Sequence, residues 1–371
     1  MFDCQRYFDH AATSPACYKD LEEIGRIYSK AWGNASSIHS VGQEAMHHVE
    51  EARKNIANLL GAEDDSQIFF TSGATESANW VINMMPEGTL IGPYEHNAIR
   101  EPALRRGFGF AKCEEGKFIV PEDCPAFCTL TVCNETGLIY DFPKDFQGIR
   151  VADITQAVGK VKINLRDYDF AFWAAHKFGG PQGVGGLYIK DPKKLDRAHS
   201  PIIGGSHEGG FRGGTYNVPG IIAMSYALTR AEETREAYLE NSKELNCALS
   251  TALVQGLAEF GYEAKFAVPR CCNVNWDAPP RVPQILTIFF PRLIGQTLVT
   301  ELGNKGFAIS SGPACSSAEI KPSHTLTALG YSEWDAVSAI RISFGHETRL
   351  DSTMELTQTL IDVVKRLTNS G

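Results

Sequence analysis

The strongest constraint on the fold is an alternation of helix-length segments with short apolar runs in the first half of the chain. Residues 43–60 place Ala45, Val49, Ala52, Ile56 and Leu59 on one face, at spacings of three and four residues, which predicts an amphipathic helix. Runs of strand length, each bounded by Gly, Pro, Asn, Asp or a charged residue, occupy residues 68–71, 89–91, 129–133, 149–153, 170–174 and 184–189. Such runs separated by helices predict an α/β fold whose largely parallel sheet is covered on both faces.

The pattern changes toward the C-terminus. The runs 170–174 and 184–189 are close enough to form an antiparallel hairpin, which we expect at the edge of the sheet. A long helical pattern covers residues 219–260. Beyond it, short strands at 284–290, 307–310 and 339–344 mix with helices at 293–305 and 351–368. We therefore expect a large domain over residues 13–245 and a smaller α+β domain over residues 246–371, joined by residues 1–12.

Composition excludes several classes of protein. The 371 residues are 43% hydrophobic and 21% charged, which is typical of a globular chain, and no stretch is apolar enough to cross a membrane. The net charge of −9 argues against a general nucleic-acid surface. The N-terminus lacks the features of a signal peptide, so we expect a cytoplasmic protein. The ten cysteines are irregularly spaced, which predicts neither a disulfide framework nor a metal site.

Lys177 gives the strongest local chemical signal. It follows the apolar run 170–174 and precedes a turn that contains five glycines, FGGPQGVGG. A lysine in such a place can lose its proton and form a Schiff base with an aldehyde cofactor such as pyridoxal phosphate. The alternative is an ordinary hairpin lysine whose amine reaches water.

Two further segments strengthen the cofactor interpretation. Asp153 ends the run 149–153 and Gln156 follows it, at the strand end where open α/β sheets bind ligands. A carboxylate there can pair with a protonated pyridine nitrogen, and an amide can donate to the ring oxygen. Residues 70–77, FTSGATES, join a strand to a helix through a small polar loop that could bind a phosphate. Read singly, Asp153 and the polar loop could equally be helix caps.

The order of the motifs resembles the class V aminotransferases, and among them the cysteine desulfurases. The matching pieces are YFDHAATSP (7–15), WGNASSIHSVGQEA (32–45), FTSGATES (70–77), EHNAI (95–99), VCNETGLI (132–139), DITQAVGK (153–160), AAHKFGGPQGVGG (174–186), GGSHEGGFRGGT (204–215), SSGPACSS (310–317) and RISFG (341–345). The resemblance implies a pyridoxal-phosphate-dependent transferase of fold type I, with a mixed, mostly parallel seven-stranded sheet.

The resemblance also implies a role for each residue that matches a family motif. Lys177 corresponds to the Schiff-base lysine, Asp153 to the partner of the pyridine nitrogen, and Gln156 to the partner of the ring oxygen. His96 corresponds to the histidine that stacks on the ring and transfers protons, although a lone histidine after a strand is more often structural. Further cofactor-binding positions are Ala74, Thr75, His176, Asn134 and, across a homodimer interface, Thr215. Arg341, Asn134 and Asn34 correspond to substrate-binding positions, with Arg341 on the α-carboxylate.

The sequence departs from the family at two positions near the phosphate. Ala174 and Gly213 stand where relatives usually have serine, which removes a hydroxyl donor in each case. A lost charge-assisted hydrogen bond is worth about 1.5–3 kcal/mol, so the resemblance predicts weaker cofactor binding unless water substitutes.

Cys315 lies in a loop of small residues that resembles the family's sulfur-accepting loop. A buried, inert loop cysteine is the alternative. The implied reaction converts L-cysteine to L-alanine, leaves a persulfide on Cys315, and passes the sulfur to an acceptor protein for iron–sulfur cluster assembly or thiolation. A pyridoxal-phosphate-dependent C–S lyase or a selenocysteine lyase would keep the same pocket, and a lyase that releases free sulfur products would not need Cys315. A weakly active scaffold protein is a third interpretation.

Overall fold

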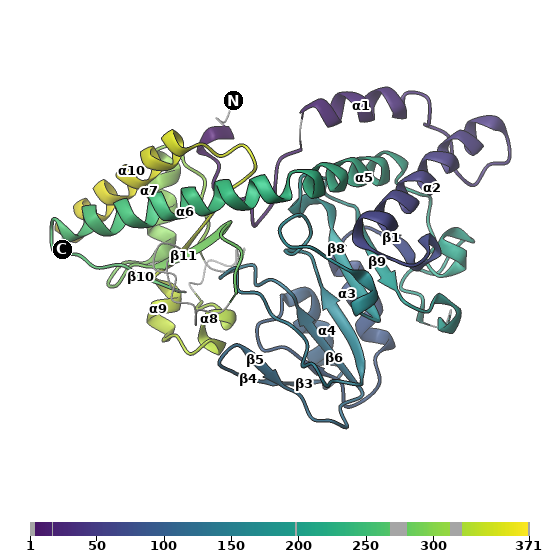
Figure 1. Cartoon of the computed structure of the whole chain (residues 1–371), viewed down its shortest axis with the longest axis horizontal. Helices are drawn as coiled ribbons and strands as arrows, with labels where there is room; N and C mark the ends of the chain where they lie inside the picture. The colour runs from purple at the N-terminus through teal and green to yellow at the C-terminus, as the bar shows by residue number, and fades with distance from the viewer. Residues whose placement is uncertain (1–3, 17, 197–198, 268–279, 312–320, 370–371) are drawn as a thin grey trace. The chain divides into compact units, whose positions relative to one another are not determined.

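A computed structural model describes residues 4–16, 18–196, 199–267, 280–311 and 321–369. These residues form two compact units (Figure 1). The larger unit comprises residues 13–132 and 140–235, and the smaller comprises residues 1–12, 133–139 and 236–371. The predicted domains, 13–245 and 246–371 with 1–12, stay a prediction.

The larger unit is built on the expected seven-stranded sheet, with strand order β1-β9-β8-β7-β6-β2-β3. Strands β8, β7, β6, β2 and β3 are parallel neighbours, whereas β9 is antiparallel to both β8 and β1. Its strands are β1 Ile68–Thr71, β2 Leu90–Ile91, β3 Gly109–Phe110, β6 Ala126–Leu130, β7 Ile149–Asp153, β8 Phe170–Ala174 and β9 Gly185–Ile189, with a separate hairpin of β4 Lys112–Glu114 and β5 Lys117–Ile119.

Helices cover this sheet. Helix α3 (Ala74–Met84) packs against β1, β7, β8 and β9 and against α4 (Asn97–Arg105), and their shared core includes Trp80, Phe172 and Leu187. Helices α1 (Tyr18–Tyr28), α2 (Ser40–Leu60) and α5 (Val218–Glu233) pack together as a second group (Figure 1).

The smaller unit contains an antiparallel sheet of β10 (Lys265–Phe266), β11 (Ile285–Phe289) and β12 (Ala339–Ser343). The N-terminal segment joins it, because Tyr7 bridges Ala308 and Asp9 bridges Ser343. Its helices are α6 Arg235–Ala258, α7 Gly295–Asn304, α8 His324–Ala328, α9 Glu333–Val337 and α10 Leu350–Asn369. Leucines of α6 and α10 line its core, together with buried residues of β11 and β12.

Several details differ from the sequence predictions. The run 307–310 forms isolated bridges at Ala308 and Ser310 rather than a strand. The strand expected at 129–133 is β6, Ala126–Leu130, because residues 131–133 turn away after the last pairing with β7. The β8–β9 hairpin exists, but β1 pairs with β9 and takes the sheet edge. The helix expected over 219–260 is two helices that part at Thr234, whose ψ of 2° leaves the helical range.

Candidate active site

Lys177 lies where the sequence places it, directly after a buried strand. Strand β8 ends at Ala174, and one 3-10 turn, Ala175–Lys177, leads into the glycine-rich segment. The turn is tied to residue Ser14, whose N–H donates to the His176 carbonyl at 2.8 Å and whose hydroxyl donates to the Lys177 carbonyl at 3.4 Å. The backbone that carries the lysine is therefore anchored on both residues.

Asp153 ends the neighbouring strand β7 and is buried. Its carboxylate accepts the Thr155 N–H at 2.9 Å. Burial raises the pKa of Asp153, while the Thr155 hydrogen bond and the charges of His96 and Lys177 act in the opposite direction. Asp153 thus lies within electrostatic reach of both residues, and the structure brings these three predicted site residues together.

His96 is exposed and begins helix α4 as its N-cap. Its Nδ1 accepts the Ala98 N–H at 3.1 Å. Since Nδ1 is an acceptor here, the neutral ring carries its proton on Nε2. The helix therefore fixes both the orientation and the tautomer of the imidazole.

His176 and Gln156 complete the polar groups at these strand ends. The His176 Nδ1 lies 3.2 Å from the Thr13 hydroxyl, and burial together with the charge of Lys177 lowers the pKa of His176 to about 4. His176 is therefore a neutral hydrogen-bonding group near pH 7. Gln156 is buried in the turn after β7.

The start of helix α3 fits a phosphate. Its N-cap is Gly73, which has φ 153°, no side-chain hydrogen bond to the helix, and open space where a Cβ would stand. The amides of the first helical turn face an uncapped end, which favours an anion. Ala74 and the exposed Thr75 lie in this turn. With Asp153, Lys177 and the neutral His176 in the same unit, the donor set fits pyridoxal phosphate.

The loop 204–215, which we call the Thr215 loop, is held by two ion pairs. Arg212 pairs with Glu76 of the first turn of α3, with its Nε at 2.8 Å and its Nη2 at 3.1 Å from the two carboxylate oxygens. Glu208 is buried and pairs with Arg53 of α2 at 2.9 and 3.0 Å. Thr215 itself is exposed.

Two glycines of the Thr215 loop touch. A Cβ added to Gly213 would lie 2.6 Å from the Gly204 Cα, closer than real Cβ atoms approach backbone. Gly213, where the family resemblance leads one to expect serine, therefore packs directly on the loop's own main chain.

The predicted substrate-binding residues belong to different units. Asn34, in the larger unit, is exposed and accepts the Ser36 N–H at 3.0 Å. In the smaller unit, buried Arg341 donates from Nη1 to the Asn134 carbonyl at 2.9 Å and from Nη2 to Asp9 Oδ1 at 2.8 Å. The Arg341 guanidinium is therefore held in one orientation by its ion pair with Asp9. Cys315 lies outside the described residues.

Two buried titratable residues, Lys160 and Glu95, lie in the motifs given above but received no role from the sequence. Lys160 follows β7 in the segment DITQAVGK, and burial, followed by the charge of Lys177, lowers its pKa to about 7. Glu95 directly precedes His96 and is fully buried. The available signal was that each lies inside a motif shared with the family, EHNAI for Glu95 and DITQAVGK for Lys160.

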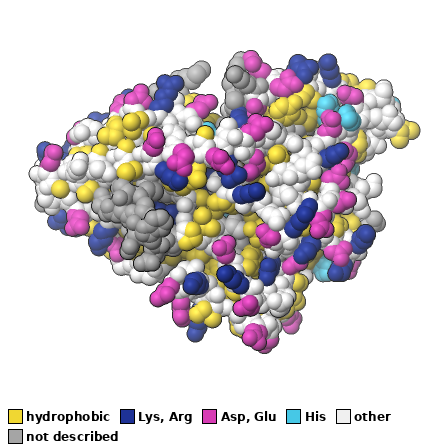
Figure 2. All heavy atoms as spheres, viewed as in Figure 1, with side chains coloured by type: hydrophobic (Ala, Val, Ile, Leu, Met, Phe, Trp, Pro, Cys, Tyr) yellow, Lys and Arg dark blue, Asp and Glu magenta, His cyan; other side chains and the backbone are white. Residues whose placement is uncertain are grey.

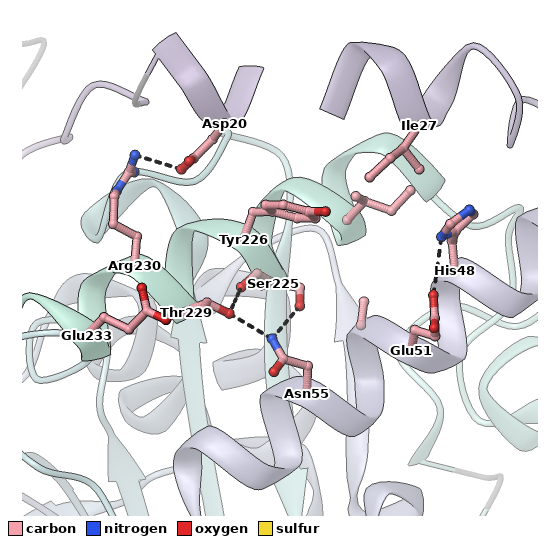
Figure 3. Close-up of a pocket in the computed structure, with 12 residues that line it drawn as sticks. Asp20, Ile27, His48, Glu51, Asn55, Ser225, Tyr226, Thr229, Arg230 and Glu233 are labelled. Atoms are coloured by element: carbon pink, nitrogen blue, oxygen red, sulfur yellow. Dashed lines mark hydrogen bonds and ion pairs between the residues drawn. The ribbon is translucent and has the colours of Figure 1, made fainter. Parts of the chain in front are cut away.

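The cavity drawn in Figure 3 is separate from these strand ends. It has a volume of about 620 Å³ and is lined by residues of α1, α2 and α5. Its polar groups bind one another: Arg230 pairs with Asp20 at 2.6 Å, and Asn55 Nδ2 donates to Ser225 and Thr229, each at 2.9 Å. None of the predicted site residues lines this cavity, so we do not place the chemistry there.

Surface charge is mixed. Figure 2 shows acidic and basic side chains interspersed over the described part of the face in view. Among the described residues, no helix is both long and apolar enough to span a bilayer.

The chain is similar to known proteins over nearly its whole length. The class-V aminotransferase family matches residues 6–106 and 120–353. Cysteine desulfurase IscS of Anaeromyxobacter sp. (strain Fw109-5) is 33% identical, covering 97% of this chain and 93% of the relative. A solved NifS-like protein is 30% identical with a TM-score of 0.81, covering 97% and 99% of the two chains. SspA, solved in complex with cysteine, is 25% identical with a TM-score of 0.71, covering 93% and 100%. The chain therefore belongs to the class-V aminotransferase family, in its group of IscS-like and NifS-like cysteine desulfurases.

Proposed function

We propose that this protein is a pyridoxal-phosphate-dependent cysteine desulfurase that converts L-cysteine to L-alanine and takes the sulfur onto Cys315. The observation that carries the proposal is the meeting of Asp153, His96 and Lys177, in which the buried carboxyl of Asp153 responds to the charges of the other two. One acid, one base and one amine of this kind are what amino-acid chemistry on a pyridine cofactor needs.

Apart from Asn134, the residues that would hold the cofactor come from the larger unit. Lys177 would bind it covalently, Asp153 would pair with the ring nitrogen, and Gln156 would donate to the ring oxygen. Ala74, Thr75 and His176 would bind the phosphate at the start of α3, with Asn134 as a further ligand. When bound, the cofactor supplies an electron sink for charge that develops at the substrate Cα.

The chain's own groups would move the proton and bind the substrate. Lys177 or His96 takes the proton from the substrate Cα, and the hydrogen bond from the Ala98 N–H to Nδ1 leaves the ring proton of the neutral His96 on Nε2. Arg341, with Asn134 and Asn34, binds the α-carboxylate, and the Asp9 ion pair keeps the Arg341 guanidinium in one orientation.

Sulfur transfer balances without an external oxidant. The Cys315 thiolate forms a sulfur–sulfur bond to the substrate thiol sulfur as the substrate Cβ–S bond breaks. The Cys315 side chain is thereby oxidised to a persulfide, and the three-carbon product gains protons at Cβ and Cα and leaves as alanine. An acceptor protein, for iron–sulfur cluster assembly or thiolation, would then take the terminal sulfur.

A homodimer is part of the proposal. Thr215 would bind the phosphate of the partner subunit, a role that suits an exposed residue on an anchored loop. The same unit exposes Trp32 (65%), Ile38 (93%) and Ile203 (89%), and apolar side chains this exposed favour burial against a second copy. We also propose a cytoplasmic location, where the thiols of such an enzyme stay reduced.

The deciding experiment is a turnover with Cys315→Ser. A serine hydroxyl is too weakly ionised near neutral pH to accept sulfur, so we expect bound L-cysteine but neither alanine nor persulfide. In the wild-type protein, one turnover should add about 32 Da, one sulfur atom, to the peptide that contains Cys315. A C–S lyase would instead continue to make pyruvate, ammonia and sulfide, and that outcome would reject the desulfurase.

The cofactor assignment has its own test. Lys177→Ala should lose the cofactor's visible absorbance band and its covalent attachment after borohydride reduction. Covalent cofactor that persists in this variant would show that another amine holds it.

A further inference from the structure

Glu95 is a fully buried acid that the reaction as proposed does not use. It stands between β2 and α4, one residue before His96. Burying a carboxyl group is costly unless the group is bound or neutral, so its position calls for a physical reason.

Glu95 anchors the turn that carries His96. Its Oε1 accepts the Leu130 N–H at 2.9 Å, at the last residue of β6. Strand β2 pairs with β6 only as far as Ile91 and Cys128, so this side chain takes the place that a longer β2 would fill. The absence of a side chain at Gly92 provides the space for the Glu95 carboxyl group, because a Cβ at Gly92 would lie 2.4 Å from Glu95 Oε1. The adjacent residue, His96, is thereby tied to the strand end beside Asp153.

The charges around Glu95 favour its protonated form. Leu130 pairs in register with Asp153, and the Asp153 carboxylate acts on Glu95 with the same sign of charge. The Thr129 hydroxyl and Leu130 amide stabilise the ion only in part, so burial and then Asp153 raise the pKa of Glu95 well above its ordinary value. The Cys128 thiol of β6, which both acids influence, is held neutral as well.

Of the two acids, Asp153 is the one whose surroundings favour the ionised form. It accepts the Thr155 amide and is offset by the charges of His96 and Lys177. Two adjacent acids of unequal surroundings share one charge, and the less compensated one keeps the proton.

We propose that Glu95 is a positioning residue, which in its neutral form fastens the His96 turn to the end of β6 and leaves Asp153 as the charged member of the pair. The inference deepens the proposed function, on which the roles of His96 and Asp153 rest.

The first test uses the protein without cofactor and compares wild type with Glu95→Gln. Glutamine keeps a carbonyl oxygen for the Leu130 N–H but cannot ionise. Folded wild-type protein holds a proton on Glu95 that the unfolded chain has released above about pH 4.3. Wild-type stability is therefore lost as the pH rises toward the folded-state pKa, with the unfolding constant rising by up to tenfold per pH unit.

We expect the stability advantage of Glu95→Gln to grow between pH 5 and pH 8 in urea titrations. A constant difference, or a variant that loses stability relative to wild type as the pH rises, would overturn the neutral form. Glu208→Gln is the matched control, since Glu208 is a buried glutamate of the same unit but is paired with Arg53. It should weaken the protein rather than reproduce the effect.

The second test concerns the anchor. Glu95→Asp keeps the acid but shortens its reach to Leu130 by one methylene, so we expect the dissociation constant of pyridoxal phosphate to rise about tenfold, the equivalent of one hydrogen bond. Glu95→Gln should bind it more tightly than Glu95→Asp does, and equal affinities would refute the anchor. The stability test needs no cofactor, so it stands even if the Cys315 and Lys177 experiments reject the desulfurase.

Discussion

Glu95 and Glu208 are buried glutamates of the same unit, and they differ in what faces them. Glu208 binds Arg53 through both carboxylate oxygens and also accepts the Phe70 N–H at 3.0 Å. Glu95 binds uncharged groups and faces the like charge of Asp153. The pair that contains arginine holds the Thr215 loop, whereas the pair of acids lies at the proposed reaction site. In this unit, the glutamate that is ion-paired with arginine serves architecture, whereas the glutamate that faces a second acid lies beside the proposed chemistry.

Among the variants that test this comparison, Arg53→Met should give the largest loss in the free energy of unfolding. The variant leaves the Glu208 carboxylate buried without its cation, which costs about 3–5 kcal/mol in the free energy of unfolding. Arg53 also covers the Phe70 ring, with its guanidinium carbon 4.6 Å from the ring centre, and methionine retains part of that packing. Guanidinium unfolding measures the change. A loss below about 1 kcal/mol would mean that the pair does not hold the loop.

The same amide substitution at the two acids should give opposite signs near pH 8. Glu208→Gln keeps one oxygen acceptor, which can serve Arg53 Nη1 and the Phe70 N–H, but it loses the negative charge and the second oxygen that accepts from Arg53 Nη2. We therefore expect a loss of about 2 kcal/mol. Glu95→Gln should be stabilising there, for the reason of linkage given above. The measurement is the urea midpoint of each variant relative to wild type in one buffer. If both midpoints shift in the same direction, the two acids do not differ in the way proposed.

Arg212→Gln should give a smaller loss, because its pair with Glu76 is only partly buried. Burial alone would raise the pKa of Glu76, but Arg212 and the Ser72 N–H lower it below its ordinary value. We expect a loss of about 1 kcal/mol at pH 7. A lowered folded-state pKa stabilises above the unfolded value of about 4.3 and is lost as the pH falls, so the difference from wild type should shrink in acid. A difference that is constant with pH would assign the effect to packing.

Lys243→Met should give the smallest change in the free energy of unfolding among these variants. Lys243 pairs with Glu240 at 2.6 Å, but the two side chains are 49% and 68% exposed. Exposed pairs of this kind contribute less than about 1 kcal/mol, and we expect a change within about 0.5 kcal/mol. A larger loss in the same denaturation series would show that the whole scale reflects general sensitivity to substitution rather than burial.

Hydrophobic periodicity predicted where helices and strands lie along the chain better than it predicted which strands pair with one another. The helix from 43 to 60 is part of α2, and five of the six early strands were placed within a residue or two. The position of β1 at the sheet edge was missed, because pairing between β1 and β9 depends on a contact between residues more than 110 positions apart. The break at Thr234 was missed because the sequence there contains neither proline nor glycine.

In the candidate site, too, residues with a local sequence signal could be predicted, whereas pairs of residues far apart in the sequence could not. Asp153, His96 and Lys177 carry local signals, because each lies at a strand end or shortly after one, and the structure brings them together. The pair of Arg53 and Glu208 has no local signal, since 155 residues separate its partners. Glu95 was visible in the motif EHNAI, but its burial is decided by Leu130 and Gly92, which come from the neighbouring strand and its own turn. The catalytic roles of Asp153, His96 and Lys177 stay predictions.

The contact between Gly204 and Gly213 has a consequence for engineering of the Thr215 loop. Serine at position 213, which the family resemblance leads one to expect, would place its Cβ 2.6 Å from the Gly204 Cα, so the Gly204 main chain must move before serine fits. A design that adds a hydroxyl at position 213 as a further phosphate ligand therefore has to change the loop around residue 204 at the same time, because serine alone strains the loop that it is meant to improve.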